Sequence, residues 1–251
     1  MTRAIIRISG QEPAKFLQGL VTNDLRHLER DGILYAALLS AQGKYLADFF
    51  LIAQPDGSIC VDVAADLAPD LMRRLAMYKL RAPVEIAQTD MPVSRGTGPA
   101  PEGVLPDPRH PALGWRLYGV SLPDDGTDWD ALRVAHCIPE TGIELVPQDT
   151  FILEAGFDRL HGVDFRKGCY VGQEVTARMQ HKTTLRKGLV TLGVEGTAPV
   201  GTEIVADGKI AGQIYTQSGG QAIAYLRFER AQPEMQAGTC RLFWQPKPEH
   251  A

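Results

Sequence analysis

The sequence predicts an α+β fold that ends in a β-rich C-terminal region. Apolar runs at 33–40 and 45–53 are joined by the turn AQGK, a pattern typical of an antiparallel hairpin. Stretches with helical periodicity lie on both sides of this hairpin. After Leu185 the chain becomes a series of short apolar runs separated by Gly and Asp-Gly turns. Antiparallel strands combined with separate helices are characteristic of the α+β class.

The N-terminal part is expected to alternate strands with two amphipathic helices. Residues 4–8 alternate weakly and predict a strand, and Pro13 suits the first turn of a helix. The apolar face of this helix would comprise Phe16, Leu17, Leu20 and Val21. Residues 58–64 and 83–88 predict further strands. The second helix lies between them, and its apolar face would comprise Leu67, Leu71, Met72 and Leu75.

The middle of the chain is expected to contain a long loop. Residues 96–112 hold five prolines and three glycines, which favour a loop. Residues 113–120 predict a strand, and Thr127 is a candidate cap for a helix that carries Trp129. A short helical stretch is expected at FILEAGF, residues 151–157.

The C-terminal part is expected to be a small β-barrel or sandwich. Short strands punctuated by turns continue from about residue 185 to the end of the chain. We therefore predict two domains, an α+β region over 1–184 and a β-domain over 185–251.

The composition is that of a globular protein, with 251 residues, 44% of them hydrophobic, and a net charge of −4. The negative charge argues against nucleic acid as the main partner. No apolar run reaches the ~20 residues that a membrane span needs, and no signal-peptide pattern opens the chain. We expect a cytoplasmic protein with no membrane partner.

The four cysteines are expected to act as separate thiols. Cys60, Cys137, Cys169 and Cys240 lie far apart, and none forms a C-x-x-C pair. Zinc sites and self-contained iron–sulfur clusters usually need clustered ligands, so no resident metal site is expected.

Cys169 stands out because of its surroundings in RKGCYVGQEVTAR, residues 166–178. Two basic residues precede it, two glycines bracket it, and a helix is plausible from Gln173. Positive charge and a helix N-terminus both lower a thiol pKa and raise its reactivity. The residues leave open the alternative that Cys169 is a small buried apolar side chain.

Basic residues are concentrated around this stretch. Between 159 and 187 there are seven Lys or Arg against two acidic residues. Such a patch can attract an anionic small molecule or nucleic acid, or it can be a solvated face. The seven are Arg159, Arg166, Lys167, Arg178, Lys182, Arg186 and Lys187.

The segment KGCYVGQE closely resembles the signature of the YgfZ family, folate-binding proteins similar to the glycine-cleavage T protein that act in iron–sulfur cluster assembly or repair. FLQGLVTNDL at 16–25, the hairpin at 38–51 and the run at 138–174 resemble other parts of that family. The resemblance covers nearly the whole chain.

The resemblance implies a T-protein-like ring with a ferredoxin-like part and a C-terminal β-barrel, in which residues 1–184 form two interleaved folate-binding subdomains. It implies tetrahydrofolate or a derivative as cofactor. It also implies iron–sulfur client proteins or assembly machinery as partners. The family's functional cysteine and lysine correspond to Cys169 and Lys167, and a folate-contacting tryptophan corresponds to Trp129.

The T protein also uses an aspartate of a hairpin for aminomethyl transfer, and the resembling hairpin here keeps Asp48. In a strand Asp48 is either buried, which could raise its pKa, or outward-facing. The candidate catalytic residues are Cys169, Lys167 and Asp48. The candidate folate-binding residues are Trp129, Lys167, Tyr170, Gln173, Glu174 and Arg178.

Three functions remain open on these residues, and so does the question of whether a reaction is catalysed. The first is a folate-dependent accessory factor for iron–sulfur proteins. The second is a folate-dependent one-carbon transferase, an aminomethyltransferase or demethylase. The third is a folate sensor or RNA-binding module that uses the basic patch, for which steep salt dependence would be expected.

Overall fold

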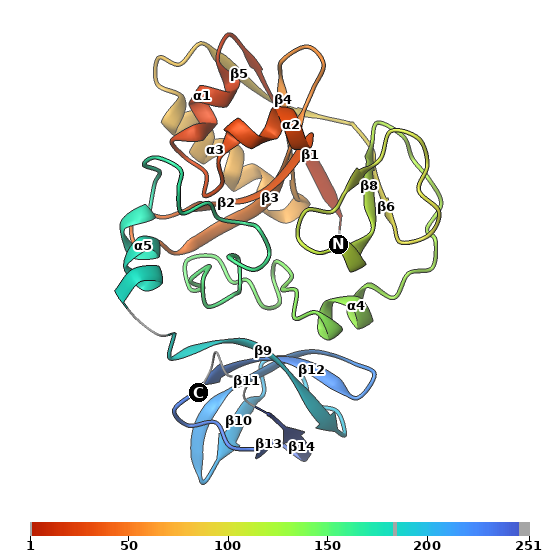
Figure 1. The fold of residues 1–251 in the computed structure, drawn as a ribbon, viewed down its shortest axis with the longest axis vertical. Helices are drawn as coiled ribbons and strands as arrows, with labels where there is room; N and C mark the ends of the chain where they lie inside the picture. Colours follow the sequence, from red (N-terminus) through yellow and green to blue (C-terminus); the bar gives the residue numbers. More distant parts are fainter. Residues whose placement is uncertain (1, 183–184, 246–251) are drawn as a thin grey trace. The chain divides into compact units, whose positions relative to one another are not determined.

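The computed structural model describes residues 2–182 and 185–245, which form a mixed α/β structure (Figure 1). The chain divides into two compact units. The first comprises residues 1–127, 147–149 and 157–177, and the second comprises 128–146, 150–156 and 178–251. Among the described helices, none is long and apolar enough to cross a membrane.

The first unit is built on a five-stranded antiparallel sheet in the order β2-β3-β4-β1-β5. The predicted hairpin is confirmed as β2 and β3, with Gly43 of the turn at φ +74°. Only glycine adopts this left-handed backbone without strain. The strands are β1 (Arg3–Gly10), β2 (Ile33–Leu39), β3 (Tyr45–Ala53), β4 (Ile59–Ala64) and β5 (Val84–Thr89).

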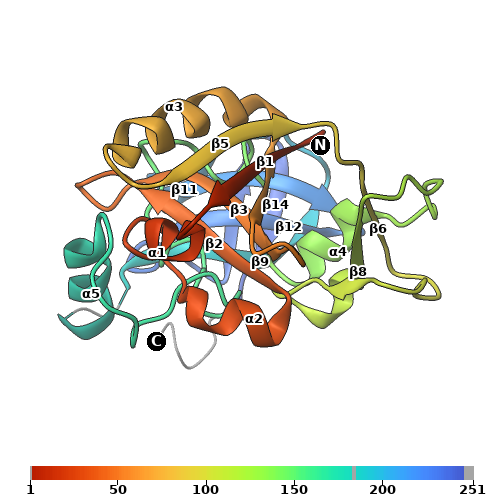
Figure 2. The ribbon, with the colours of Figure 1, turned by 90° about the horizontal axis from the view of Figure 1, so that it is seen from above.

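Short helices bury one face of this sheet. Alternate residues of β3, Ala47, Phe49 and Leu51, point into a core that includes Leu17, from the first helix, and Leu71. Figure 2 shows α3 lying along β5 and β1. The helices are α1 (Pro13–Gln18), η1 (Leu25–His27), α2 (Leu28–Asp31), η2 (Ala65–Leu67) and α3 (Ala68–Lys79).

The proline-rich segment contains part of a second, three-stranded sheet in the order β6-β8-β7. The strands are β6 (Val93–Gly96), β7 (Leu105–Pro106) and β8 (Trp115–Tyr118), and a short helix η3 (Pro111–Leu113) precedes β8. The rest of residues 96–112 is loop, as expected.

The second unit contains α4 (Trp129–Ala135) and a closed six-stranded barrel in the order β10-β11-β12-β9-β14-β13. The Asp-Gly turn between β10 and β11 is confirmed, since Asp207 and Gly208 have φ of +47° and +72°. The barrel strands are β9 (Lys187–Glu195), β10 (Glu203–Ala206), β11 (Lys209–Ser218), β12 (Gln221–Arg227), β13 (Glu234–Ala237) and β14 (Cys240–Phe243).

Three local predictions are wrong. Helix α1 ends at Gln18, because Val21 leaves the helical path to bridge Leu38 of β2. Residues 151–157 form turns, and Gly156 adopts a φ of +75° that ends any helix. Asp128, and not Thr127, caps α4 by accepting a hydrogen bond from Ala131 N at 2.9 Å.

The predicted domain division at residue 184/185 remains a prediction. The compact units assign residues 128–146 and 150–156 to the same unit as the barrel. Residues 1, 183–184 and 246–251 of the two predicted domains lie outside the described residues.

Candidate functional site

Cys169 is exposed on an irregular loop, between the buried residues Lys167 and Tyr170. The helix predicted from Gln173 is confirmed as α5 (Gln173–Lys182). Cys169 is therefore not the buried apolar side chain of the alternative interpretation. Of the other three thiols, Cys60 and Cys240 are buried and Cys137 is half-buried.

Lys167 is 4% exposed and holds its loop in place. Its ammonium Nζ donates hydrogen bonds to the backbone oxygens of Gln18, Val21 and Asn23 at 2.8, 2.5 and 2.9 Å. A lysine ammonium has three protons, so these carbonyls use its full donor capacity. Burial lowers the pKa of Lys167 to about 8. The role of Lys167 in folate binding stays a prediction, and a folate carboxylate would have to displace one of these carbonyls to reach the ammonium.

The segment 16–25 and the run into the signature, which lie far apart in sequence, come together in the first unit. Thr22 donates from Oγ1 to the carbonyl of Gly162 at 2.6 Å. Asn23 donates from Nδ2 to the carbonyl of His161 at 2.8 Å. Together with the Lys167 bonds, these contacts position the Cys169 loop.

The glycines of the signature and of the hairpin turn allow a close approach of two loops. Gly172 has φ +81°, and a Cβ there would lie 2.5 Å from the carbonyl oxygen of Ser40. A Cβ on Gly43 would lie 2.7 Å from Cβ of Val175. Any side chain at Gly172 would therefore displace the turn between β2 and β3.

Asp48 is buried, so of the two alternatives, a buried or an outward-facing side chain, the first is correct. Its carboxylate accepts hydrogen bonds from the hydroxyls of Tyr35 at 2.9 Å and Tyr45 at 2.7 Å. Burial and the neighbouring Asp48 raise the pKa of Tyr35 well above its usual value. Tyr35 therefore stays protonated and donates to Asp48.

The remaining predicted residues are divided between the two units. Tyr170 is buried in the first unit, its ring centroid 5.0 Å from Nζ of Lys167, and burial raises its pKa to about 12. Gln173 and Glu174 open α5. Trp129, the first residue of α4, and Arg178 belong to the second unit.

The basic patch is only partly a solvated face. Lys167 is buried, whereas Arg159, Arg166, Arg178 and Arg186 are exposed or half-buried. The side chain of Lys182 lies outside the described residues.

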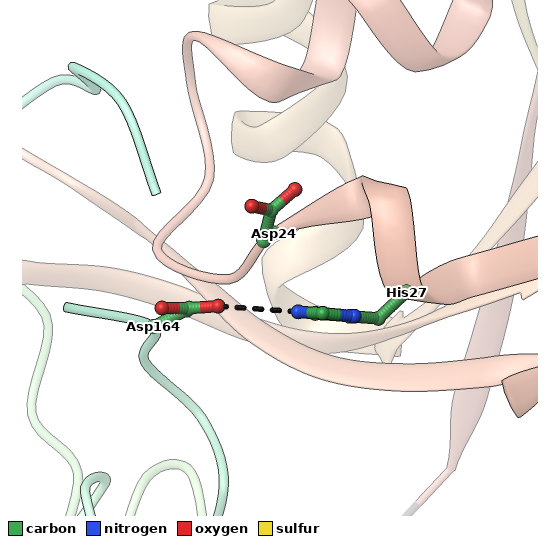
Figure 3. A group of neighbouring side chains, drawn as sticks. All are labelled: Asp24, His27 and Asp164. Atoms are coloured by element: carbon green, nitrogen blue, oxygen red, sulfur yellow. Dashed lines mark ion pairs between the residues drawn. The ribbon is translucent and has the colours of Figure 1, made fainter. Parts of the chain in front are cut away.

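Asp24, His27 and Asp164 form a group whose candidate ligand atoms lie within 4.8 Å of one another (Figure 3). The carboxylate of Asp24, however, already accepts hydrogen bonds from Arg26 and Gln18. Hydrogen bonding to Arg26 holds the pKa of Asp24 well below its usual range. A cation here would have to displace a guanidinium, so these residues do not fit a metal ion well.

A pocket of about 600 Å³ in the first unit was not predicted from the sequence. Its lining comes from residues 23–35, 106–108 and 158–166. These three segments are separated by long stretches of chain, so no motif spacing could predict that they share a pocket. The last segment ends three residues before Cys169.

Comparisons with known proteins agree on family and fold. A family model described as the C-terminal beta-barrel domain of CAF17 matches residues 186–248. The mouse (Mus musculus) protein named "Iron-sulfur cluster assembly factor IBA57, mitochondrial" is 30% identical over 272 residues, which cover 90% of this chain and 76% of that protein. The Mycosarcoma maydis homolog of IBA57 is 34% identical over 230 residues, covering 78% of this chain and 57% of that protein.

Among solved structures, the glycine cleavage system aminomethyltransferase T from Bartonella henselae superposes with a TM-score of 0.76. The match covers 98% of this chain and 84% of that chain at 15% identity, which shows a shared fold. The predicted T-protein-like α+β fold with a C-terminal β-barrel is confirmed.

Two findings limit or correct the sequence-based expectations. The chain spans little more than half the length of some relatives, 57% of the Mycosarcoma maydis protein and 55% of the Neurospora crassa protein. The expected cytoplasmic location is contradicted, because these relatives and the mouse protein are all named as mitochondrial. The absence of a recognisable leader in the sequence was not a sufficient basis for that expectation.

Proposed function

This chain belongs to the family of the iron-sulfur cluster assembly factor IBA57, and from that premise we propose that it binds tetrahydrofolate and assists the assembly or repair of iron–sulfur proteins. The observation that carries the proposal is the exposed thiol of Cys169, on a loop held by the buried ammonium of Lys167. The K-G-C-Y-x-G-Q-E resemblance to the YgfZ family supports the same role.

A thiol in this position suits iron–sulfur chemistry. Thiolates are the usual ligands of iron in clusters, and an exposed one can be reached by a second protein. One thiol cannot hold a cluster alone, so the remaining ligands would come from the partner. The proposed partners are therefore iron–sulfur client proteins or the machinery that assembles their clusters.

The residues fit the proposed folate in part. Arg178 is exposed and could donate charge-assisted hydrogen bonds to the glutamate carboxylates. Lys167 does not fit that role, because its ammonium is directed at three backbone carbonyls. Trp129 is half-buried and offers an aromatic face for the pterin. Bound tetrahydrofolate would supply a carrier for one-carbon groups.

The proposal is tested by replacing the thiol while keeping its surroundings. In a strain that lacks this gene, wild-type protein and Cys137→Ala should restore the activity of enzymes that carry [4Fe–4S] clusters. Cys169→Ala should not restore it, although calorimetry should give it the same affinity for tetrahydrofolate as wild type. Restoration by Cys169→Ala would refute the role of the thiol, and absence of folate binding by wild type would refute the cofactor.

The buried Asp48 favours a second candidate, a folate-dependent one-carbon transferase. Two tyrosine hydroxyls hold this carboxylate in a fixed position, as a group that handles a proton would require. Turnover of a methylated amine or an aminomethyl donor with tetrahydrofolate, lost in Asp48→Asn, would support this candidate over the accessory role.

A further inference from the structure

The pocket between α2, the start of β2 and residues 158–166 has the size of a small-molecule site. Its volume is about 600 Å³, and ligand pockets are typically about 300–1,000 Å³. Leu34, Tyr35 and Val163 provide an apolar part of the lining. Every lining residue belongs to the first unit.

Charged groups and histidines line the same pocket, and some of them pair with one another. Arg30 pairs with its neighbour Asp31 at 2.6 Å, and His27 lies 3.4 Å from Asp164. Within residues 2–182 and 185–245, no ion pair or side-chain hydrogen bond engages the side chains of Asp158, His161 or Arg166. The pocket therefore offers one carboxylate, one imidazole and one guanidinium to a ligand.

The backbone at His161 is held in a conformation that non-glycine residues rarely adopt, with φ +55°. Asn23 fixes it, because its Nδ2 donates both to the carbonyl of His161 and to that of Tyr35, each at 2.8 Å. Strained residues that their surroundings over-determine occur preferentially at ligand sites. This strain is thus an observation independent of the charges, and it points to the same pocket.

We propose that this pocket binds a zwitterionic peptide of two or three residues. The carboxylate of Asp158 would receive its ammonium group, and the guanidinium of Arg166 its carboxylate. An apolar side chain of the peptide would contact Leu34 and Val163. A polyanion fits less well, because three aspartates line the pocket. This ligand is separate from the proposed folate, and the inference does not rest on the proposed function.

The tripeptide Gly-Leu-Gly is the probe, and its termini can be blocked one at a time. Methyl NMR of the full chain should show saturable shifts at Ile33, Leu34 and Val163, with a dissociation constant below about 1 mM. Acetylation of the amino end and amidation of the carboxyl end should each weaken binding about tenfold, because each removes one charge-assisted hydrogen bond.

Variants assign the two ends of the peptide to the two charges. Asp158→Asn should weaken binding of Gly-Leu-Gly about tenfold but leave binding of the acetylated peptide unchanged. Arg166→Gln should also weaken binding of Gly-Leu-Gly about tenfold but leave binding of the amidated peptide unchanged. Lys79→Gln is the control, since Lys79 is on α3 and does not line the pocket. The proposal is wrong if no methyl shifts saturate, if both blocked peptides bind as tightly as the parent, or if Lys79→Gln weakens binding as much as the pocket variants.

Discussion

At the scale of single residues, Lys167 and Cys169 have opposite surroundings although they are two positions apart. The lysine is buried and directs its charge at three carbonyls, whereas the cysteine is exposed. The sequence could predict that both matter, because the signature contains both. It could not assign their roles, since the carbonyls come from residues 18–23, nearly 150 positions earlier.

Lys167→Ala should destabilise the fold more than it changes any binding site directly. It leaves the carbonyls of Gln18, Val21 and Asn23 without their donor, at a cost of about 1–3 kcal/mol for each buried unsatisfied group. We expect the free energy of unfolding in urea to fall by about 3 kcal/mol or more. The exposed Lys15→Ala should change it by less than about 0.5 kcal/mol. Equal effects of the two variants would show that the carbonyl contacts are unimportant.

The pH dependence of stability should reveal the buried ammonium. The pKa of Lys167 is about 8 in the folded protein and 10.5 when exposed. Between these values the unfolded chain binds more protons than the folded one, so this residue's contribution to the unfolding free energy rises with pH. Urea denaturation between pH 7.5 and about 9.5 should show this rise in wild type relative to Lys167→Met, a window that ends below the titration of tyrosine. A difference that is constant or falls with pH would contradict the burial of this charge.

At the scale of elements, the sequence is informative where local signals agree with tertiary contacts. The hairpin β2–β3 and the start of α5 follow from turn and helix patterns and are confirmed. Helix α1 is shorter than its pattern because pairing of Val21 with β2 overrides helical periodicity. The sequence could not show whether Asp48 is buried or faces outward. Strand β3 is buried on both faces, so its residues do not alternate between apolar and polar in a way that would reveal the direction of a side chain.

Gly172→Ala should separate the signature loop from the hairpin turn. The substitution forces a Cβ to 2.5 Å from the carbonyl oxygen of Ser40 at a φ of +81°. We expect a loss of about 2–4 kcal/mol in unfolding free energy, from the strained backbone and from the displaced turn. Gly168→Ala is the matched control, because a Cβ added there would meet no atom within 4 Å and its φ is not positive. Similar melting temperatures for both variants would contradict the close approach.

At the scale of the whole molecule, the residues that resemble a known family predicted more than composition did. The eight-residue signature led to the T-protein-like fold and the iron–sulfur family, both of which the comparisons support. The cytoplasmic location, inferred from what the N-terminus lacks, was wrong. The pocket that we assign to a peptide could not be predicted, because it exists only when three distant segments are folded together.

The central claim is that Cys169 is the most exposed of the four thiols. It is tested most directly by treating native protein with a small alkylating agent and following each cysteine by mass spectrometry. Cys169 should react first, well before the buried Cys60 and Cys240, and denaturation should remove the difference. The account is contradicted if Cys169 is modified no faster than the two buried thiols in the native protein.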